Sequence, residues 1–291
     1  MAGIGHCSSG SSTCPVLYCA AGYCSWRRVA LDSKALTRRD QNMGNWYDNL
    51  RRSDLIASPF PRPWQEHLHR RIWQYQQLDF SQRCKLHDCI KVIVAEVDWV
   101  GEDKHYVNEM MKVTIAGHIS LMLVGLDDDF MDEARTIRIC RQEFDDNQET
   151  DPIYHTETKS GRACPDGTTI LSWHHVLNAR RGGDRNLVVH EFAHHFDRRD
   201  GKMSATVMFD DSNNQRRWEA IVAEEYADLC EAAATGQWTI LRHYGAKNRT
   251  EFFAVASECF FESPDRMQRS HAELYDLLHT FYNLDTAKWL A

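Results

Sequence analysis

The apolar residues of this chain recur mainly at helical spacing. Two successive runs lie between residues 64 and 96: Trp64, Leu68, Ile72 and Tyr75, then Leu86, Ile90, Ile93 and Val94. Residues three and four apart share one face of a helix, so both runs predict helices that bury one side. Similar spacing predicts further helices over residues 218–234, 251–262 and 271–289.

Other segments predict a buried element and two short strands. The apolar stretch 113–126 is too short to span a membrane and is predicted to be a buried core element. Alternation at Ile137-Arg138-Ile139 predicts a strand, and so does the stretch 168–173. The sequence therefore predicts an α+β fold, mostly helical with a small sheet.

The first 57 residues look different from the rest. They are rich in Gly, Ser, Arg and Asp, and Pro59, Pro61 and Pro63 then form a stiff entry into the globular part. We expect residues 1–57 to be a disordered leader and residues 58–291 to be the folded domain. The leader contains Cys7, Cys14, Cys19 and Cys24, whose spacing matches no zinc ribbon. A small redox or metal-binding appendage is the alternative interpretation.

Composition limits the class of protein. The chain has 291 residues, 43% of them hydrophobic and 26% charged, which is ordinary for a soluble globular protein. The formal net charge of −8 argues against a general nucleic-acid binder. No secretory signal is recognisable, and six cysteines are scattered singly, so we expect a reducing cytoplasm and no membrane partner.

The strongest chemical signal is the motif His190-Glu191-Phe192-Ala193-His194, an H-E-x-x-H sequence within an apolar run. On a helix, His190 and His194 share a face and can bind one metal ion, while Glu191 can take a proton from metal-bound water. Asp184 is a possible N-cap of this helix, and Gly201 a plausible stop. A surface helix with incidental histidines would be more charged than this one.

Two histidines do not complete a catalytic zinc site, which takes three protein ligands and a water. No further histidine follows His194 at the spacing of three-histidine sites, so a later carboxylate is expected. Glu251 and Glu258 both lie in an apolar helical run, where a carboxylate must be paired or metal-bound. Position alone favours Glu251 slightly and leaves Glu258 open, and a salt bridge would explain either one.

These motifs carry a resemblance to a known family. H-E-F-A-H-x-x-D at 190–197, followed by E-F-F-A-V-x-S-E at 251–258, resembles the Mlc titration factor A metallopeptidases, also called glucose-regulated metallopeptidases. The catalytic domain of anthrax lethal factor is similar more distantly. The resemblance extends over roughly residues 58–285 and leaves the leader unmatched.

The resemblance implies a zincin-like, gluzincin-like peptidase domain with one Zn²⁺ per chain. Its third zinc ligand maps onto Glu251, and a tyrosine seven residues earlier maps onto Tyr244, whose phenol could donate to an oxyanion. Asp197 and Glu258 are candidates for orienting the ligands from outside the metal shell. His195 faces away from the histidine pair and is not expected to be a ligand.

We therefore expect a zinc peptidase, amino- or endopeptidase, that hydrolyses peptide or protein substrates with Glu191 as the general base and Tyr244 as an oxyanion donor. The alternative is a regulatory protein that binds a transcriptional regulator and has a structural or weakly active zinc site. A purely structural site would need neither Glu191 nor an open coordination position, so the peptidase is favoured.

Overall fold

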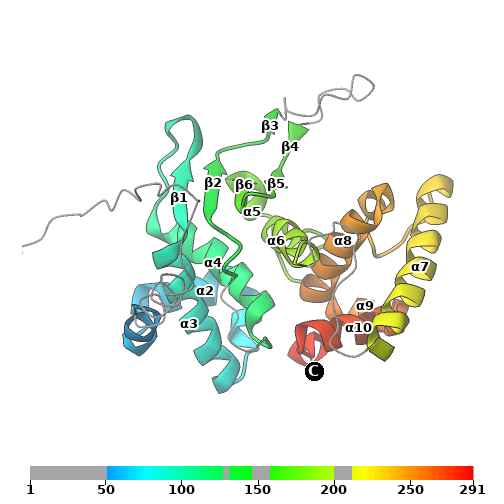
Figure 1. The fold of residues 1–291 in the computed structure, drawn as a ribbon, viewed down its shortest axis with the longest axis horizontal. Helices are drawn as coiled ribbons and strands as arrows, with labels where there is room; N and C mark the ends of the chain where they lie inside the picture. The colour runs from blue at the N-terminus through cyan, green and yellow to red at the C-terminus, as the bar shows by residue number, and fades with distance from the viewer. Residues whose placement is uncertain (1–50, 127–130, 146–157, 200–211, 291) are drawn as a thin grey trace, which may run out of the picture. The chain divides into compact units, whose positions relative to one another are not determined.

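The computed structural model describes residues 51–126, 131–145, 158–199 and 212–290 (Figure 1). Most of the predicted leader, with its four cysteines, lies outside these residues, and so does Gly201. Residues 51–57 are the exception, because they are helical although the leader was expected to include them. Within the described residues, no helix is both long and apolar enough to cross a lipid bilayer.

The N-terminal helices are α2 (Arg62–Arg71), η1 (Trp73–Gln76), α3 (Phe80–Glu96), η2 (Glu102–Lys104) and α4 (Glu109–Leu123). Two of them begin at side-chain caps. Asp79 accepts from the backbone N–H of Gln82 at 2.8 Å and so starts α3, and Asn108 accepts from Met111 at 2.9 Å and starts α4. The predicted buried segment 113–126 is largely α4, whose residues 113–123 are all buried.

A glycine lies at the contact between two of these helices. A Cβ on Gly117 of α4 would lie 2.8 Å from Cδ2 of Leu68 and would also press on Ile72. Glycine at this position therefore leaves room for the ends of the Leu68 and Ile72 side chains against α4, and an alanine would have to displace them.

The main sheet has four strands, β1 (Asp98–Gly101), β2 (Thr136–Cys140), β5 (Gly161–Ala163) and β6 (Thr168–Ser172), in the order β1-β2-β6-β5. The first three in this order are parallel, and β5 pairs with β6 in antiparallel fashion at the edge of the sheet. The short strands β3 (Phe144–Asp145) and β4 (Thr158–Lys159) form a separate antiparallel pair.

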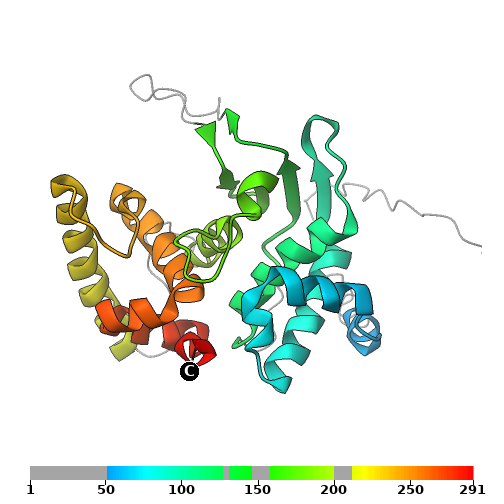
Figure 2. The same cartoon turned by 180° about the vertical axis from the view of Figure 1, so that it is seen from behind.

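The remaining helices follow the sheet in the chain: α5 (Trp173–Val176), α6 (Leu187–Asp197), α7 (Ser212–Thr235), η3 (His243–Lys247), α8 (Arg249–Glu262), α9 (Pro264–Ser270), α10 (Ala272–Tyr282) and η4 (Thr286–Leu290). Helix α6 packs against α4, α8 and the strands β5 and β6, and Figure 2 shows α6 and α8 side by side from behind. All eleven residues of α6 are buried, which explains why its sequence is apolar outside the motif.

The predicted mostly helical α+β fold is confirmed, with helices and strands where residues 64–96, 137–139, 168–173, 218–234 and 251–262 predicted them. The predicted final helix over 271–289 is wrong as one element. It is divided at Asn283, which adopts a left-handed backbone (φ 47°) and ends α10. The strands β1 and β5 and the helix α9 were not predicted, because each is too short to show a period of its own.

The predicted N-cap of α6 is also wrong. Asn186, not Asp184, caps this helix, and its side-chain oxygen accepts from the backbone N–H of Val189 at 3.2 Å. Asp184 is exposed, while Asn186 is buried at 1% exposure. The cap is therefore part of the interior, which an N-cap preference alone does not indicate.

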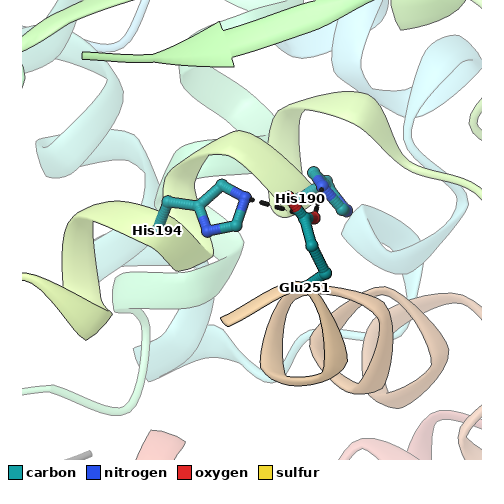
Figure 3. A group of neighbouring side chains, drawn as sticks. All are labelled: His190, His194 and Glu251. Atoms are coloured by element: carbon teal, nitrogen blue, oxygen red, sulfur yellow. Dashed lines mark ion pairs between the residues drawn. The ribbon is translucent and has the colours of Figure 1, made fainter. Parts of the chain in front are cut away.

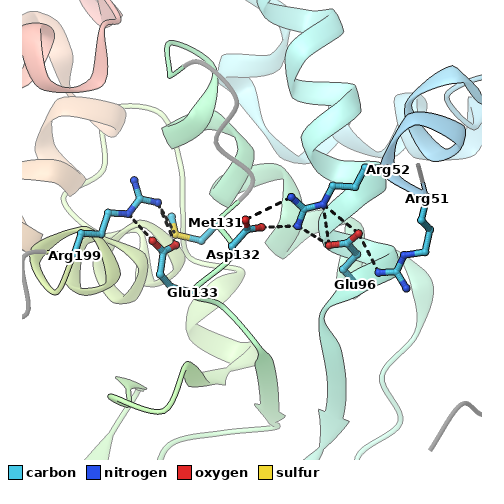
Figure 4. A network of polar contacts seen from close by, with 7 residues as sticks. All are labelled: Arg51, Arg52, Glu96, Met131, Asp132, Glu133 and Arg199. Atoms are coloured by element: carbon cyan, nitrogen blue, oxygen red, sulfur yellow. Dashed lines mark hydrogen bonds and ion pairs between the residues drawn. The ribbon is translucent and has the colours of Figure 1, made fainter. Parts of the chain in front are cut away.

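Ion pairs connect the N-terminal segment and the end of α6 to the loop before β2 (Figure 4). Arg52 contacts Glu96 at 2.7 Å and Asp132 at 2.5 Å. Arg199, two residues beyond α6, contacts Glu133 at 2.9 Å. Because most of these side chains are partly exposed, each pair contributes at most about 1 kcal/mol, but together they hold Asp132 and Glu133, just before β2.

Candidate metal centre

Three potential ligands meet between α6 and α8. His190 and His194 lie one turn apart on α6, and Glu251 lies in the first turn of α8 (Figure 3). The Nε2 atom of His190 is 3.0 Å from Oε2 of Glu251, and Nε2 of His194 is 3.6 Å from the same oxygen. One ligand atom from each residue lies within 4.8 Å of the other two. The structure therefore brings together the three predicted ligands.

The arrangement fits a zinc ion. Ligand atoms about 2.1 Å from a tetrahedral zinc lie roughly 3.4 Å from one another, close to the two measured separations. Oε2 of Glu251 is buried, yet it forms no properly aligned hydrogen bond with any residue that the structure describes. A buried carboxylate oxygen in this condition normally has a partner, and a cation between the three side chains would supply it.

The position of Glu251 follows from the start of α8. The side chain of Asn248 caps this helix by accepting from the backbone N–H of Glu251 at 2.8 Å. Burial alone would raise the pKa of Glu251, but the neighbouring His190 and His194 hold it well below its usual range. Glu251 is therefore an anion directed at both imidazoles.

Glu258 orients one of the two histidines. Its Oε1 lies 2.8 Å from Nδ1 of His190, so the opposite nitrogen, Nε2, faces Glu251. Oε1 also accepts from Arg242, and Oε2 accepts from the backbone N–H of Asn186 at 2.6 Å. Burial disfavours the charged form of His190, but Glu258 and Glu251 outweigh it and raise its pKa to about 10. The contact places Glu258 outside the three ligand atoms, as an orienting carboxylate.

Asn186 connects this centre to a second buried carboxylate. Its Nδ2 donates to Glu262 at 2.6 Å and lies 3.1 Å from Nδ1 of His118. Glu262 also accepts from Trp73 at 3.0 Å and from Gln74 at 3.1 Å. Burial raises the pKa of Glu262 to about 7 despite these donors. One residue thus caps the motif helix and joins the two buried carboxylates of α8.

Glu191 lies against the edge of the sheet. It is buried at 5% exposure, and burial raises its pKa, although His190 and His194 act in the opposite direction. A Cβ on Gly161 of β5 would overlap Oε1 of Glu191, so the strand can approach the carboxylate only through glycine. A carboxyl group with a raised pKa next to a candidate metal is typical of a general base.

A cleft of about 310 Å³ gives access to this group. Its lining includes Gly161, His190, Glu191, Arg242, Tyr244 and Glu258. The ring of Tyr244 lies 5.8 Å from that of His190 and is 43% exposed, with Arg242 and Lys247 near its face. Tyr244 therefore stands beside the candidate metal centre at its open side.

The remaining histidines and Asp197 have other surroundings. Nε2 of His195 lies 2.8 Å from the hydroxyl of Thr169, so this ring faces the sheet. His175 lines the cleft and pairs with Glu143 at 3.1 Å, whereas His174 is exposed and is not part of that lining. Asp197 is the last residue of α6 and is buried, but it does not line the cleft.

Sequence reasoning missed Gly161, Asn186 and Arg242. Asn186 carries a usable signal, because an asparagine directly before an apolar run is a common N-cap. Gly161 and Arg242 carry none, since both act through contacts between segments far apart in the chain.

Comparison with known proteins relates the chain to a metallo-peptidase family. Residues 46–283 match the family model described as glucose-regulated metallo-peptidase M90. The uncharacterised protein slr2042 of Synechocystis sp. is 30% identical over 83% of this chain and 90% of its own length. Mlc titration factor A of Salmonella agona is 26% identical over 63% of this chain and 72% of its own, and that of Escherichia coli O1:K1 is 27% identical over 61% and 70%.

The family match contains all three candidate ligands, Glu191 and Tyr244. It also begins at residue 46, within the expected leader of residues 1–57. On this match, and on the similarity to slr2042 over most of both chains, the protein belongs to the glucose-regulated metallo-peptidase M90 family.

Proposed function

We propose that this protein is a zinc-dependent peptidase. The observation that carries the proposal is the convergence of Nε2 of His190, Nε2 of His194 and Oε2 of Glu251 beside the buried carboxylate of Glu191. Zinc held by these three atoms would lower the pKa of a bound water to about 7 and polarise a substrate carbonyl.

The side chains around this group have complementary roles. Glu191 accepts a proton from the attacking water and later returns it to the leaving amine. Tyr244, at the open side of the cleft, donates a hydrogen bond to the oxyanion that develops on the substrate carbonyl. Glu258 holds Nδ1 of His190, so that Nε2 stays directed at the metal.

The experiment that tests this proposal is cleavage of casein and of aminoacyl-anilide substrates by purified protein, with and without a chelator. We expect cleavage that the chelator abolishes and that zinc restores. Glu191→Gln keeps the metal ligands, so it should bind zinc and lose at least about 100-fold in kcat/KM. Equal cleavage by wild type and Glu191→Gln would contradict the role of the base.

A regulatory function is the alternative. The relatives named Mlc titration factor A bear a name that refers to the titration of Mlc, and an equivalent partner for this chain would be a transcriptional regulator. Under this alternative, Glu191→Gln would leave the biological function unchanged, because partner binding needs no base. The proposed location is the cytoplasm, on the scattered single cysteines of the sequence.

A further inference from the structure

Most charged side chains of the cleft are paired with one another. Glu143 pairs with His175 at 3.1 Å, and Glu258 is held between His190 and Arg242. Arg185 lines the same cleft and is exposed. Its guanidinium makes no ion pair or hydrogen bond with any residue in the described part of the chain. Arg185 is therefore a cation of the cleft that still has its full hydrogen-bonding capacity.

The cleft continues past Arg185 into a second hollow of about 360 Å³. The two hollows share Asn178 and Arg185 in their linings, so they adjoin. The second hollow adds Arg180 and Asp184, which leaves two guanidinium groups against one carboxylate around it. A peptide that extends from the metal centre in this direction therefore meets an excess of positive charge.

We propose that Arg185 binds a carboxylate of the substrate, so that this site prefers peptides with a carboxylate near the scissile bond. The proposal rests on the proposed function, because it assigns a ligand to the same cleft. The carboxylate belongs either to an Asp or Glu side chain or to the C-terminus of a short peptide. Both present two coplanar oxygens, which the guanidinium can bind through two parallel N–H groups.

The test compares peptides that differ only in this charge. One set carries Asp or Asn at each of three positions on either side of the scissile bond, and a second set carries a free or an amidated C-terminus. For wild type we expect one pair of peptides to differ. In that pair, kcat/KM should be about three- to tenfold higher for the peptide with the carboxylate than for its neutral partner. The set that shows the preference identifies whether the carboxylate is a side chain or a terminus.

Variants of Arg185 assign the preference to this residue. The preference is the ratio of kcat/KM for the carboxylate peptide to kcat/KM for its neutral partner. In Arg185→Gln this ratio should fall to about one, and Arg185→Glu should favour a peptide with Lys at the same position. Arg216→Gln is the matched control, because Arg216 is an exposed arginine of α7 outside the cleft lining and its loss changes the net charge equally. This control should keep the wild-type ratio. A ratio of one in wild type, or an unchanged ratio in Arg185→Gln, would overturn the inference.

Binding measurements separate this inference from the proposed function. Fluorescence anisotropy of labelled peptides on zinc-loaded Glu191→Gln reports binding without cleavage. If the protein cleaves no peptide, but Glu191→Gln prefers the carboxylate peptide and the double variant with Arg185→Gln does not, the peptidase proposal fails and the carboxylate site stands. If wild type cleaves both peptides of every pair equally, the carboxylate site fails and the peptidase stands.

Discussion

Glu191 and Gly161 form a close contact between the sheet and the motif helix at the candidate metal centre. The carboxylate lies where a side chain on β5 would begin, so the position of the proposed base depends on a residue that has no side chain. The imidazole of His190 is fixed in a different way, by a hydrogen bond from Nδ1 to Glu258. Base and ligand are therefore positioned by separate elements, which makes their roles separable by mutation.

Replacing Gly161 by alanine should displace the base and leave the metal in place. Gly161 has no left-handed backbone angle, so the new methyl group acts through its overlap with the carboxylate of Glu191 and with the end of the Leu187 side chain. We expect kcat/KM to fall by about 10- to 100-fold, because small displacements of a catalytic group have effects of this size. The zinc affinity, measured by competition with a chromophoric chelator, should change less than about threefold, since no ligand moves. A parallel loss of zinc would show that β5 supports the ligands instead.

Replacing Glu258 by glutamine should weaken the metal site itself. The amide is a weaker hydrogen-bond acceptor than the carboxylate for the Nδ1–H of His190 and for Arg242, so His190 loses its fixed orientation. We expect zinc affinity to fall by about 10- to 100-fold in the same chelator competition. Glu262→Gln is the matched control one turn further along α8, because Glu262 contacts Trp73, Gln74 and Asn186 but neither ligand histidine. If both variants lose zinc equally, Glu258 has no special role.

Among the helices, α6 depends on its cap more than its apolar sequence suggests. Asn186 accepts from Val189, donates to Glu262 and supplies the backbone N–H that Glu258 accepts. The start of the motif helix and the orientation of His190 therefore share one residue.

Asn186→Ala should lower the free energy of unfolding by about 1–3 kcal/mol, because it removes the cap and one of the hydrogen-bond donors to the buried Glu262. Asp184→Ala tests the cap that the sequence pattern favoured. Asp184 is exposed, so this variant should stay within about 0.5 kcal/mol of wild type. Urea unfolding of the metal-free proteins measures both values. A larger effect of Asp184→Ala than of Asn186→Ala would restore the original N-cap prediction.

The sequence predicted the long helices because their apolar residues repeat over several helical turns. It predicted His190, Glu191 and His194 because these residues lie within five positions of the chain. It could not decide between Glu251 and Glu258 from the residues alone, since both occupy one apolar run. The structure separates them by contacts: Glu251 faces the Nε2 atoms, whereas Glu258 faces Nδ1. Gly161 and Arg242 could not be predicted, because their roles arise only when β5 and the segment before η3 reach α6.

At the scale of the molecule, burial keeps several histidines of the described residues neutral, and its effect on the pKa is large at His87, His118 and His195. Burial lowers the pKa of His87, His118 and His195 to about 4 in each case. His118 lies 3.1 Å from Nδ2 of Asn186 and His195 lies 2.8 Å from the hydroxyl of Thr169, both hydrogen-bonding distances for a neutral ring. His87 stacks on Phe60 with ring centroids 3.7 Å apart.

These depressed pKa values predict a loss of stability in mild acid. The unfolded chain binds protons at about pH 6.5, whereas the folded chain resists them down to about pH 4, so the histidine contribution is complete above pH 6.5 and is lost between these values. His87→Gln removes one such group. The decrease in the free energy of unfolding between pH 7 and pH 4.5 should therefore be smaller in this variant by roughly 1–2 kcal/mol, after allowance for solvent screening. Urea unfolding at pH 7 and at pH 4.5 measures it. An equal loss in wild type and variant would contradict the assignment to His87.

The central claim is that His190, His194 and Glu251 hold one zinc ion that peptide cleavage requires. The most direct measurement is a titration of zinc into metal-free protein, with peptide cleavage recorded at each addition. For wild type we predict that cleavage rises linearly and stops rising at one zinc per chain, and that Glu251→Ala shows no such break and remains inactive. Full cleavage by the metal-free protein, or a wild-type break at one equivalent that Glu251→Ala retains, would contradict the account.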